Sequence, residues 1–162
     1  MAVDMFMQIT KVTGESTDKQ FAGAIEVVSW NWGLTQSGSA HSGTGSGAGK
    51  VNVNDLSFVK YVDTASPVLT MACCNGQAFP KATLSLRKAG TSALVYLVVT
   101  LQNVMVSSVA LATSGGDDRQ TEVVSLNFSQ FTYQYTPQKP DGTGGAAITV
   151  TWNIPGNTPA LV

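Results

Sequence analysis

The stretch that most suggests chemistry is Gly38–Lys50, GSAHSGTGSGAGK, with glycines at positions 38, 43, 45, 47 and 49. A phosphate-binding loop of the Walker A type needs a glycine, four residues and then Gly-Lys-Ser/Thr. Gly49-Lys50 fits the end of that pattern, but Thr44 stands where the first glycine belongs and Val51 replaces the hydroxyl residue. The dinucleotide pattern GxGxxG fails too, because position 48 is alanine. The segment therefore predicts no nucleotide site.

The other reactive side chains do not form a catalytic set. His41 is the single histidine and lies in the glycine-rich segment, where a catalytic group would lack rigid support. Cys73 and Cys74 are adjacent, a poor geometry for a disulfide, and have no CxxC or His/Cys cluster around them. Asp117-Asp118, with Arg119 beside them, are typical of a surface loop. A glycosidase-like carboxylate pair stays open among the ten acidic residues, but nothing selects one.

These observations predict a protein that is not an enzyme and has no cofactor and no metal. The paired cysteines are expected to be small, buried side chains, and they favour synthesis in a reducing cytoplasm. The start of the chain, MAVDMFMQITKV, lacks the charged and apolar regions of a secretory signal. No apolar run approaches the length of a membrane span, so we expect no membrane insertion.

Low charge is the main compositional signal. Charged residues make up 12% of the 162 residues, with a net charge of −1, against about 25% in an average soluble domain. Such a surface resists association poorly, so we expect much of it to be covered by copies of the same chain. A Ser/Thr-rich monomer is the open alternative. The absence of any run of Lys and Arg argues against nucleic acid as a partner.

The elements that must position these residues are mostly strands. In Phe21–Thr35 the alternation places Ile25, Val27 and the small polar set Ser29, Asn31 and Gly33 on one face, and Glu26, Val28, Trp30, Trp32 and Leu34 on the other. We expect the two tryptophans in the core or in a subunit interface. The other expected strands are Met5–Val12, Val53–Val62, Phe79–Arg87, Leu94–Leu101 with its continuation to Val109, Thr121–Tyr135, and a last strand carrying Ile148, Val150, Trp152 and Ile154 on one face.

One helix is predicted. Ser66 is placed as its N-cap, Pro67 at the first helical position and Gly76 as its stop. Its apolar stripe consists of Val68, Leu69, Ala72 and Cys73. We expect this helix, of about nine residues by these signals, to close one end of an all-β body.

Within Thr121–Tyr135 the apolar phase changes. Val124, Leu126 and Phe128 occupy even positions, whereas Phe131, Tyr133 and Tyr135 occupy odd ones. A change near Ser129-Gln130 indicates a β-bulge. Strands far outnumber helices, which predicts an all-β barrel or sandwich with one short helix. Gly38–Lys50 is interpreted as an arm that reaches away from this body and becomes ordered against another chain.

The motifs and their order are similar to those of the Hcp (haemolysin-coregulated protein) family, the tube proteins of bacterial type VI secretion systems. The matching stretches run almost from end to end: MAVDMFMQI, GES at 14–16, VVSWNWGLTQSGS, GAGKVNVNDLSFVKYVD, SPVLTMAC, KATLSLRKAG, GGDDR, VVSLNFSQFTYQYTPQKPDG and TWNI. The resemblance implies one Hcp-like domain over residues 1–162. Its fold would be a compact β-barrel of two packed sheets, with a helix on its side and a long extended glycine-rich loop.

The same resemblance implies hexameric rings that stack into an expelled tube. Partners would be other copies of the chain, the sheath, tip (spike) and baseplate proteins, and small effector proteins in the lumen. The chain would be made in the bacterial cytoplasm and secreted without a signal peptide to the extracellular space or a target cell. Ser29, Asn31 and Gly33 are the hypothetical lumen and effector contacts, with Trp30 and Trp32 packed inward.

The ring faces are expected to carry four loops, Gly38–Lys50, Lys88–Ser92, Gly115–Arg119 and Lys139–Gly144. The interface residues proposed in them are Gly38, Ser39, His41, Gly43, Gly45, Gly47, Gly49, Lys50, Gly90, Gly115, Asp117, Asp118 and Arg119. Edges of sheets are expected to pair between neighbours.

Two alternatives stay open at this stage. A phage tail-tube relative or a lectin-like β-sandwich would act as a non-enzymatic binding module. A family member fused to a toxin enzyme would need a further domain, which we do not expect because the sequence stops at Val162, just after the last strand.

Overall fold

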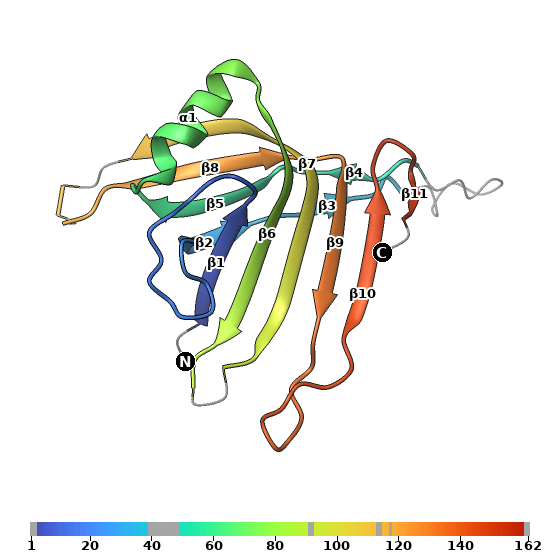
Figure 1. The fold of residues 1–162 in the computed structure, drawn as a ribbon. Coiled ribbons are helices and arrows are strands. Elements are labelled where there is room, and N and C mark those ends of the chain that lie inside the picture. Colours follow the sequence, from blue (N-terminus) through green and yellow to red (C-terminus); the bar gives the residue numbers. More distant parts are fainter. Residues whose placement is uncertain (1–2, 39–48, 91–92, 113–114, 117, 161–162) are drawn as a thin grey trace.

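The computed structural model describes residues 3–38, 49–90, 93–112, 115–116 and 118–160. Strands dominate it, and the one helix, α1, spans Ala65–Asn75 (Figure 1). The strands are β1 Val3–Ile9, β2 Ile25–Asn31, β3 Leu34–Thr35, β4 Asn52–Val53, β5 Leu56–Tyr61, β6 Ala78–Lys88, β7 Val95–Ala112, β8 Thr121–Asn127, β9 Gln130–Tyr135, β10 Ile148–Asn153 and β11 Thr158–Pro159.

The main sheet closes on itself, which confirms the predicted barrel. Its strand order is β11-β10-β9-β7-β6-β1-β2-β5-β8, and β8 pairs back onto β7. Two walls result and share the long strand β7. We call β10, β9, the first half of β7, β6 and β1 the first wall, and β2, β5, β8 and the second half of β7 the second wall. Figure 1 shows the strands of the two walls running across each other.

Both walls turn their apolar side chains toward one core. Alternation along β5 buries Leu56 and Phe58, and alternation along β8 buries Val124 and Leu126. The first wall contributes Met7, Ile9, Ala82, Leu84, Leu86, Leu97, Val99 and Leu101 to the same cluster. Period-2 burial of this kind is what an antiparallel sheet with one solvated face requires.

The predicted strand Phe21–Thr35 is interrupted. It contains β2, a break after Asn31 and the short strand β3. The register of β2 against β5 shifts between Val27 and Ser29, so Val27 and Trp30 both face the core. The expectation that Val27 shares a face with Ser29 is therefore wrong, because one extra residue in the strand exchanges its two faces. Trp30 and Trp32 pack against the core, as predicted.

The phase change near Ser129 has a different cause from the one predicted. Asn127 pairs with Met105 and Gln130 with Gln102, so the register of the ladder does not change between β8 and β9. The partner strand β7 changes phase at the same level: Leu101 and Val104 are both buried, and Asn103 between them has a φ of 52°. Its side-chain amide donates to the Ser129 hydroxyl at 3.0 Å. Two paired strands therefore exchange faces together, without a bulge, where the ladder passes from one wall to the other.

Helix α1 packs against β7 on the side of the barrel. It ends where predicted, at Gly76, whose φ of 69° favours glycine. Its N-cap is Thr64, not Ser66; Ser66 is buried inside the first turn. Leu69 and Ala72 are buried as expected, but Val68 is 42% exposed, which corrects its placement in the buried stripe.

Candidate assembly interface

The outer face of the second wall carries a row of small polar side chains. Asn31 lies opposite Ser57, Ser57 opposite Ser125, and Ser125 opposite Ser108, so one row crosses all four strands. The Ser57 and Ser125 hydroxyls are 2.7 Å apart. Directly opposed residues share a face of a sheet, so the row is set by register and by the alternation that buries Phe58 on the other side.

A second row runs beside the first on the same face. It joins Ser29, Val59, Val123 and Ala110. Neither row contains a charged residue or an aromatic ring. The opposite face of the same strands packs into the core, with Trp30 opposite Phe58 and Val124 opposite Val109. It is apolar except for the buried pair Lys60 and Glu122. The second wall thus presents two central rows of uncharged side chains on its outer face; charge on this face lies beside them, at Glu26 of β2 and at Arg119 over Tyr61.

Ser29 and Asn31, two of the predicted lumen residues, lie exposed in these rows. Gly33 does not: it follows the end of β2, where its carbonyl accepts from the Asn54 N–H at 3.0 Å. Sequence reasoning missed Ser57, Ser108 and Ser125. The available signal was the alternation Leu56, Phe58 and Val124, Leu126, which turns the serines between them outward, but the row itself depends on the register between strands.

The second wall has two edges that are open for part of their length. β1 pairs with β2 only at Ile25 and Glu26, so on that side the rest of β2 has no partner strand within the described residues. β6 pairs with β7 from Val95 to Met105, and within the same described part Val106–Ala112 is paired only on its β8 side. Open edges present unpaired N–H and C=O groups to any strand that approaches them.

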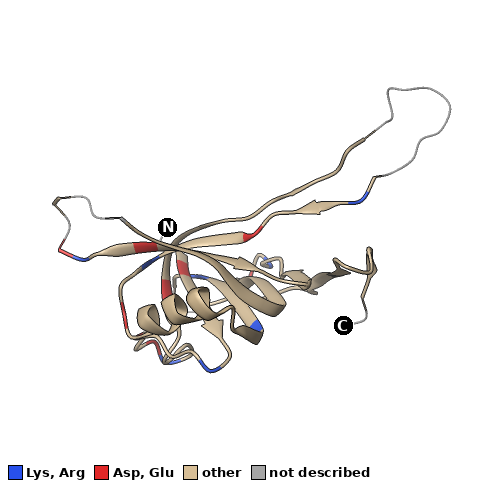
Figure 2. Cartoon of the chain, turned by 90° about the horizontal axis from the view of Figure 1, so that it is seen from above, with Lys and Arg blue, Asp and Glu red and all other residues tan. Residues whose placement is uncertain are grey.

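The arm begins as a two-stranded ribbon. β3 pairs with β4, and the Trp32 indole N–H donates to the Asn54 carbonyl at 3.0 Å just below them. Figure 2 shows this ribbon leaving the barrel with few charged side chains along it. Gly38 and Lys50 are exposed. The predicted contacts Ser39, His41, Gly43, Gly45 and Gly47 lie outside the described residues.

Gly49 lies close to the other side of the ribbon. A Cβ at this position would overlap the Ser37 hydroxyl and stand 3.3 Å from the Gln36 side-chain oxygen, both on rotatable side chains. Contacts below about 3 Å force a shift of one partner. The two sides of the ribbon therefore approach each other closely at Gly49, which agrees with an arm that is narrow at this level.

The remaining predicted interface residues are spread over several corners of the molecule. Gly90 lies in the β6–β7 turn and is exposed, with a φ of 149°. Gly115, Asp118 and Arg119 are exposed in the connection between β7 and β8, and the Arg119 guanidinium lies 4.0 Å from the centre of the Tyr61 ring. Asp117 and Ser92 lie outside the described residues.

The fourth predicted loop, Lys139–Gly144, is a hairpin in which the Lys139 N–H donates to the Thr143 carbonyl at 2.8 Å. The structure thus does not bring the predicted interface residues into one patch. They mark the arm, the β6–β7 turn, the β7–β8 connection and this hairpin separately (Figure 1).

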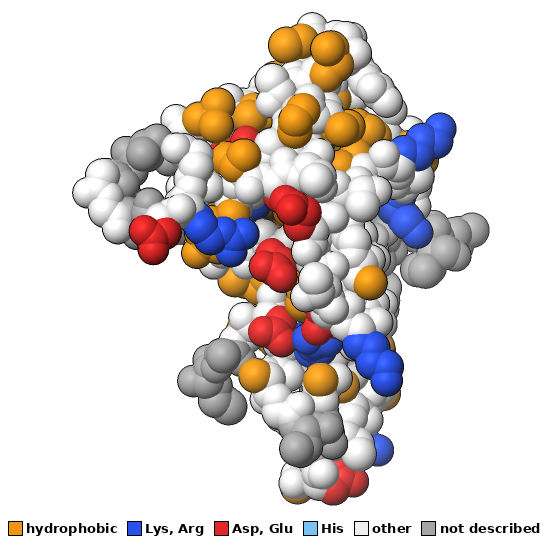
Figure 3. Space-filling model, turned by 60° about the vertical axis from the view of Figure 1, so that its left-hand side comes forward, with side chains coloured by type: hydrophobic (Ala, Val, Ile, Leu, Met, Phe, Trp, Pro, Cys, Tyr) orange, Lys and Arg blue, Asp and Glu red, His pale blue; other side chains and the backbone are white. Residues whose placement is uncertain are grey.

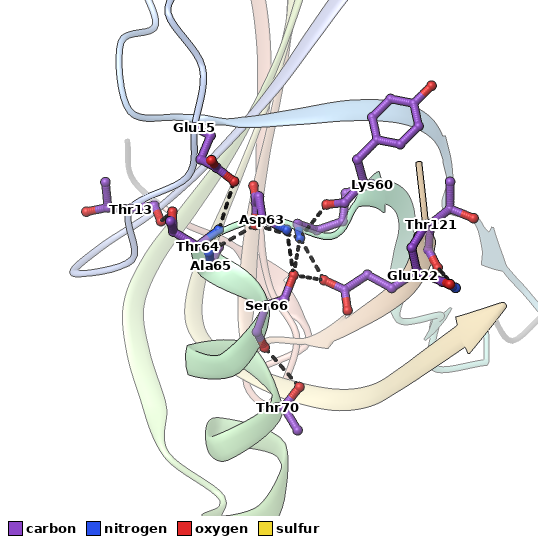
Figure 4. Close-up of polar contacts among 12 residues, drawn as sticks. Thr13, Glu15, Lys60, Asp63, Thr64, Ala65, Ser66, Thr70, Thr121 and Glu122 are labelled. Atoms are coloured by element: carbon purple, nitrogen blue, oxygen red, sulfur yellow. Dashed lines mark hydrogen bonds and ion pairs between the residues drawn. The ribbon is translucent and has the colours of Figure 1, made fainter. Parts of the chain in front are cut away.

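A buried ionic cluster fixes the second wall to α1 (Figure 4). Lys60 and Glu122 are directly opposed on β5 and β8, and their side chains are 0% and 1% exposed. The Lys60 ammonium lies 2.6 Å from Glu122 Oε1 and 2.8 Å from Asp63 Oδ1, and donates to Ser66 Oγ at 2.9 Å. Ser66 in turn donates to Glu122 at 2.6 Å. Every hydrogen-bonding member has a partner, which is what makes burial of these charges tolerable.

The first turn of α1 is held by further polar contacts. The Ala65 N–H donates to Asp63 Oδ1 at 2.9 Å, and the Thr64 N–H donates to Glu15 at 3.1 Å. These carboxylates satisfy N–H groups that a helix start leaves without partners, and they oppose the positive end of the helix dipole. The cluster therefore positions α1, β5 and β8 relative to one another; it is closed to solvent and has a supporting role.

A second charged cluster fastens the segment before β2. Arg87 on β6 binds Asp4 at 2.9 Å and Asp18 at 3.0 Å, and its guanidinium lies 5.3 Å from the Phe6 ring and 5.6 Å from the Phe21 ring. The hydrogen bond from Arg87 lowers the pKa of Asp18 from 3.8 to about 2. Phe6 and Phe21 stack with their centroids 4.5 Å apart. This pairing holds the loop that contains Asp18 against the first wall.

Among the described residues, no group of three or more His, Cys, Asp or Glu side chains could hold a metal ion. None of the described helices is long and apolar enough to cross a bilayer. What the geometry offers is surface: a face crossed by two uncharged rows, open strand edges and a projecting arm. These features define the class of the protein, an all-β barrel shaped for contact with other protein surfaces.

The comparisons with known proteins give the family. Residues 6–135 match the family model described as "Type VI secretion system effector, Hcp". Protein hcp1 of Pseudomonas aeruginosa strain PAO1 is 54% identical over 162 residues, covering 99% of this chain and 100% of that protein. This chain therefore belongs to the Hcp family, and its role is that of a tube component of a bacterial type VI secretion system.

Solved structures agree with this assignment. A type six secretion system protein superimposes with a TM-score of 0.93 at 31% identity, over 98% of this chain and 100% of that chain. Hcp1 from Salmonella typhimurium has a TM-score of 0.81 at 34% identity, over 99% of this chain and 100% of that chain. The family assignment favours a structural protein of the secretion machine over the lectin-like alternative.

Proposed function

We propose that this chain forms hexameric rings that stack into the inner tube, with the outer face of the second wall lining the lumen. The observation that carries the proposal is the uncharged row Asn31, Ser57, Ser125 and Ser108, which crosses every strand of that wall. Small polar side chains of this kind suit a channel along which protein cargo slides, because they offer neither strong charges nor large apolar groups to hold it. Ser29 and Asn31 are then cargo contacts, and Gly33 marks the mouth of the channel.

Ring closure is proposed to use the two open edges of this wall. The free side of β2 in one copy would pair with the free side of β7 in the next, since Val106–Ala112 offers backbone groups that β6 leaves unused. The two edges belong to opposite sides of the same wall, so the contact is head-to-tail and can close into a ring. Pairing also removes edges that otherwise promote aggregation.

The arm and the exposed loops are proposed to lie on the ring faces. Gly38, Gly49 and Lys50 project with the β3–β4 ribbon, and Gly115, Asp118 and Arg119 lie at the β7–β8 connection. In Figure 1 these two ends point away from each other, which suits contacts between one ring and the next. Gly90 and the Lys139–Gly144 hairpin would add contacts around the rim.

The proposal takes residues 1–162 as one barrel domain with a structural role and no catalysis. Its partners would be other copies of the chain, the sheath, spike and baseplate proteins, and small effectors. Export would occur through the secretion machine itself, from the cytoplasm and without a signal peptide.

Negative-stain electron microscopy of the purified protein, with light scattering on the same sample, tests the ring. We expect rings with a central hole and a mass near six chains. A monodisperse monomer at all protein and salt concentrations would overturn the proposal.

The lining is tested separately, by labelling. Ser57→Cys, made with Cys73→Ser and Cys74→Ser, is reacted with a maleimide-gold particle and imaged. We expect gold density at the centre of the rings. Gln102→Cys is the matched control, because Gln102 is exposed on the first wall, and its gold should appear at the periphery. Gold at the periphery for Ser57→Cys would place the second wall outside the lumen.

A further inference from the structure

The strands β9 and β10 expose an apolar face that belongs, by register, to the core. Phe131 is opposed to Trp152, Tyr133 to Val150, and Tyr135 to Ile148. On the other side of β9, the same three residues oppose the buried Leu101, Val99 and Leu97. The core face of the first wall thus continues without a break onto β9 and β10.

This continuation lacks a cover. Ile148 is 65% exposed and Val150 56%, whereas Thr151, which points to the other side of β10, is buried and lies within 3.1 Å of Thr132. In Figure 1 the β9–β10 pair reaches beyond the strands of the second wall that cover the core elsewhere. We call Tyr133, Tyr135, Ile148 and Val150 the bare face. β9 and β10 contain no charged residue.

The bare face ends in a recess at the base of the arm. A pocket of about 370 Å³ is lined by Leu34, Gln36, Gly49, Val51, Phe131, Val150, Trp152 and Asn157. None of these side chains is charged. A charged ligand would find no partner in it, so the occupant of this surface must itself be apolar and uncharged.

The chain carries a second surface with these properties. Helix α1, ASPVLTMACCN, contains no charged residue at all, although a helix on the surface of a soluble protein ordinarily turns charges to water. Instead it exposes Val68 at 42% and Met71 at 60%. Figure 3 shows hydrophobic side chains gathered at the α1 end of the molecule.

The two surfaces lie on opposite sides of the barrel and next to the two open edges. α1 packs against β7, whose free edge is Val106–Ala112. In Figure 1 α1 lies at the top of the molecule. In the same view β10 begins at the bottom, below the level of β2. Pairing β7 of one copy with β2 of the next would carry α1 of the first copy toward the bare face of the second.

We infer that the outer face of α1 docks onto the bare face of β9 and β10 in a neighbouring copy of this chain. The inference rests on the proposed ring and names the side-chain contact that accompanies its edge pairing. Helix burial against an apolar surface is a common mode of recognition. The contact is heterologous, since a helix meets a sheet, so it recurs around the ring until the ring closes.

Site-directed cross-linking tests the contact. Met71→Cys and Val150→Cys are combined in a background of Cys73→Ser and Cys74→Ser, and the protein is oxidised and run without reductant. We expect a ladder of covalent multimers. The matched control replaces Val150→Cys by Thr149→Cys, its exposed neighbour on the opposite face of β10, and should stay largely monomeric on the gel. If Met71→Cys with Val150→Cys forms rings of normal mass but no covalent multimers, the inference is overturned and the ring proposal stands. If the parent protein forms no rings, the ring proposal itself is overturned.

A charge exchange gives a second, independent readout. Met71→Glu alone and Val150→Lys alone should each lower the ring fraction in light scattering at least severalfold, because each buries an unpaired charge. Met71→Glu with Val150→Lys should restore most of it. Both residues are exposed in the single chain, so folding is not at risk. Full ring formation by both single variants would overturn the contact.

Discussion

The buried cluster around Lys60 is charged, and the bare face of β9 and β10 is exposed but apolar. In both regions the polarity is the reverse of what burial or exposure ordinarily favours. Lys60 and Glu122 are charged yet 0% and 1% exposed, whereas Ile148 and Val150 are apolar yet 65% and 56% exposed. With only 12% charged residues, the chain still buries Lys60, Arg87 and Glu122, and it leaves the bare face and α1 without any charge.

This contrast separates internal specificity from external contact. A buried, fully paired charge contributes little net stability, but a shifted register would leave it unpaired at high cost. An exposed apolar face contributes nothing to the isolated chain and gains only when another protein covers it. The first region therefore specifies how the chain folds, and the second is available for how chains join.

The largest effect is expected from removing one charged partner of the buried Lys60–Glu122 pair. Lys60→Met leaves Glu122 buried without its cation, and we expect the free energy of unfolding to fall by about 3–5 kcal/mol. Urea denaturation measures it. The double variant Lys60→Met with Glu122→Leu should recover most of the loss, and Lys81→Met, at an exposed position, should change little. A loss below about 1 kcal/mol for Lys60→Met would mean that the pair behaves like a surface ion pair.

A smaller effect is expected where the ladder passes between the walls. Asn103 has a φ of 52°, which a β-branched residue tolerates poorly. Asn103→Val should cost about 1–3 kcal/mol, also by urea denaturation, and Asn103→Gly should cost less because glycine accepts this conformation. Equal losses for the two variants would attribute the effect to the lost hydrogen bond with Ser129 instead of to backbone strain.

Acid should weaken the Arg87 cluster. Arg87 lowers the pKa of Asp18 from 3.8 to about 2, so the folded state favours the carboxylate. This stabilisation is present above about pH 4 and is lost as the pH falls toward 2. The difference in urea midpoint between the parent and Asp18→Asn should therefore be constant from pH 7 to 5 and shrink below pH 4. Asp118→Asn, at an exposed residue, is the control. A difference that does not change between pH 5 and pH 2 would contradict the pairing.

The smallest effect is expected on the outer face of the second wall. Ser57→Ala removes a hydroxyl that is 2.7 Å from Ser125 but lies on the solvated side of β5, so unfolding should change by no more than about 0.5 kcal/mol. The ring mass should stay the same. A loss comparable to that of Asn103→Val would show that the face is part of the fold's support and not a free surface.

Elements that depend on local pattern could be predicted from the sequence. The alternation of Ala82, Leu84 and Leu86 gave β6, and the long apolar run from Leu94 gave β7. Gly76 marked the end of α1 because the helix ends in a left-handed backbone conformation, which depends on the glycine itself and not on a tertiary contact. The inward packing of Trp30 and Trp32 followed from their shared phase, even though a bulge separates them from Val27.

Features that depend on pairing between distant strands could not be predicted. The serine row requires the registers of three strand pairs at once. Ser66 has every local mark of an N-cap, but a tertiary contact with Lys60 and Glu122 decides its role. One signal was available: Lys60 continues the buried phase of Leu56 and Phe58, and Glu122 that of Val124 and Leu126. Opposite charges at positions that the alternation of each strand buries indicate an ion pair between the two strands.

The unbroken register of β7 across the junction of β8 and β9 has a mechanical consequence. Because Asn127–Met105 and Gln130–Gln102 belong to one ladder, the two walls are joined through backbone hydrogen bonds as well as through side-chain packing. A force applied along the first wall is transmitted to the second as shear across that ladder, which loads many hydrogen bonds together instead of opening them one at a time. The barrel should thereby resist shear between its two walls.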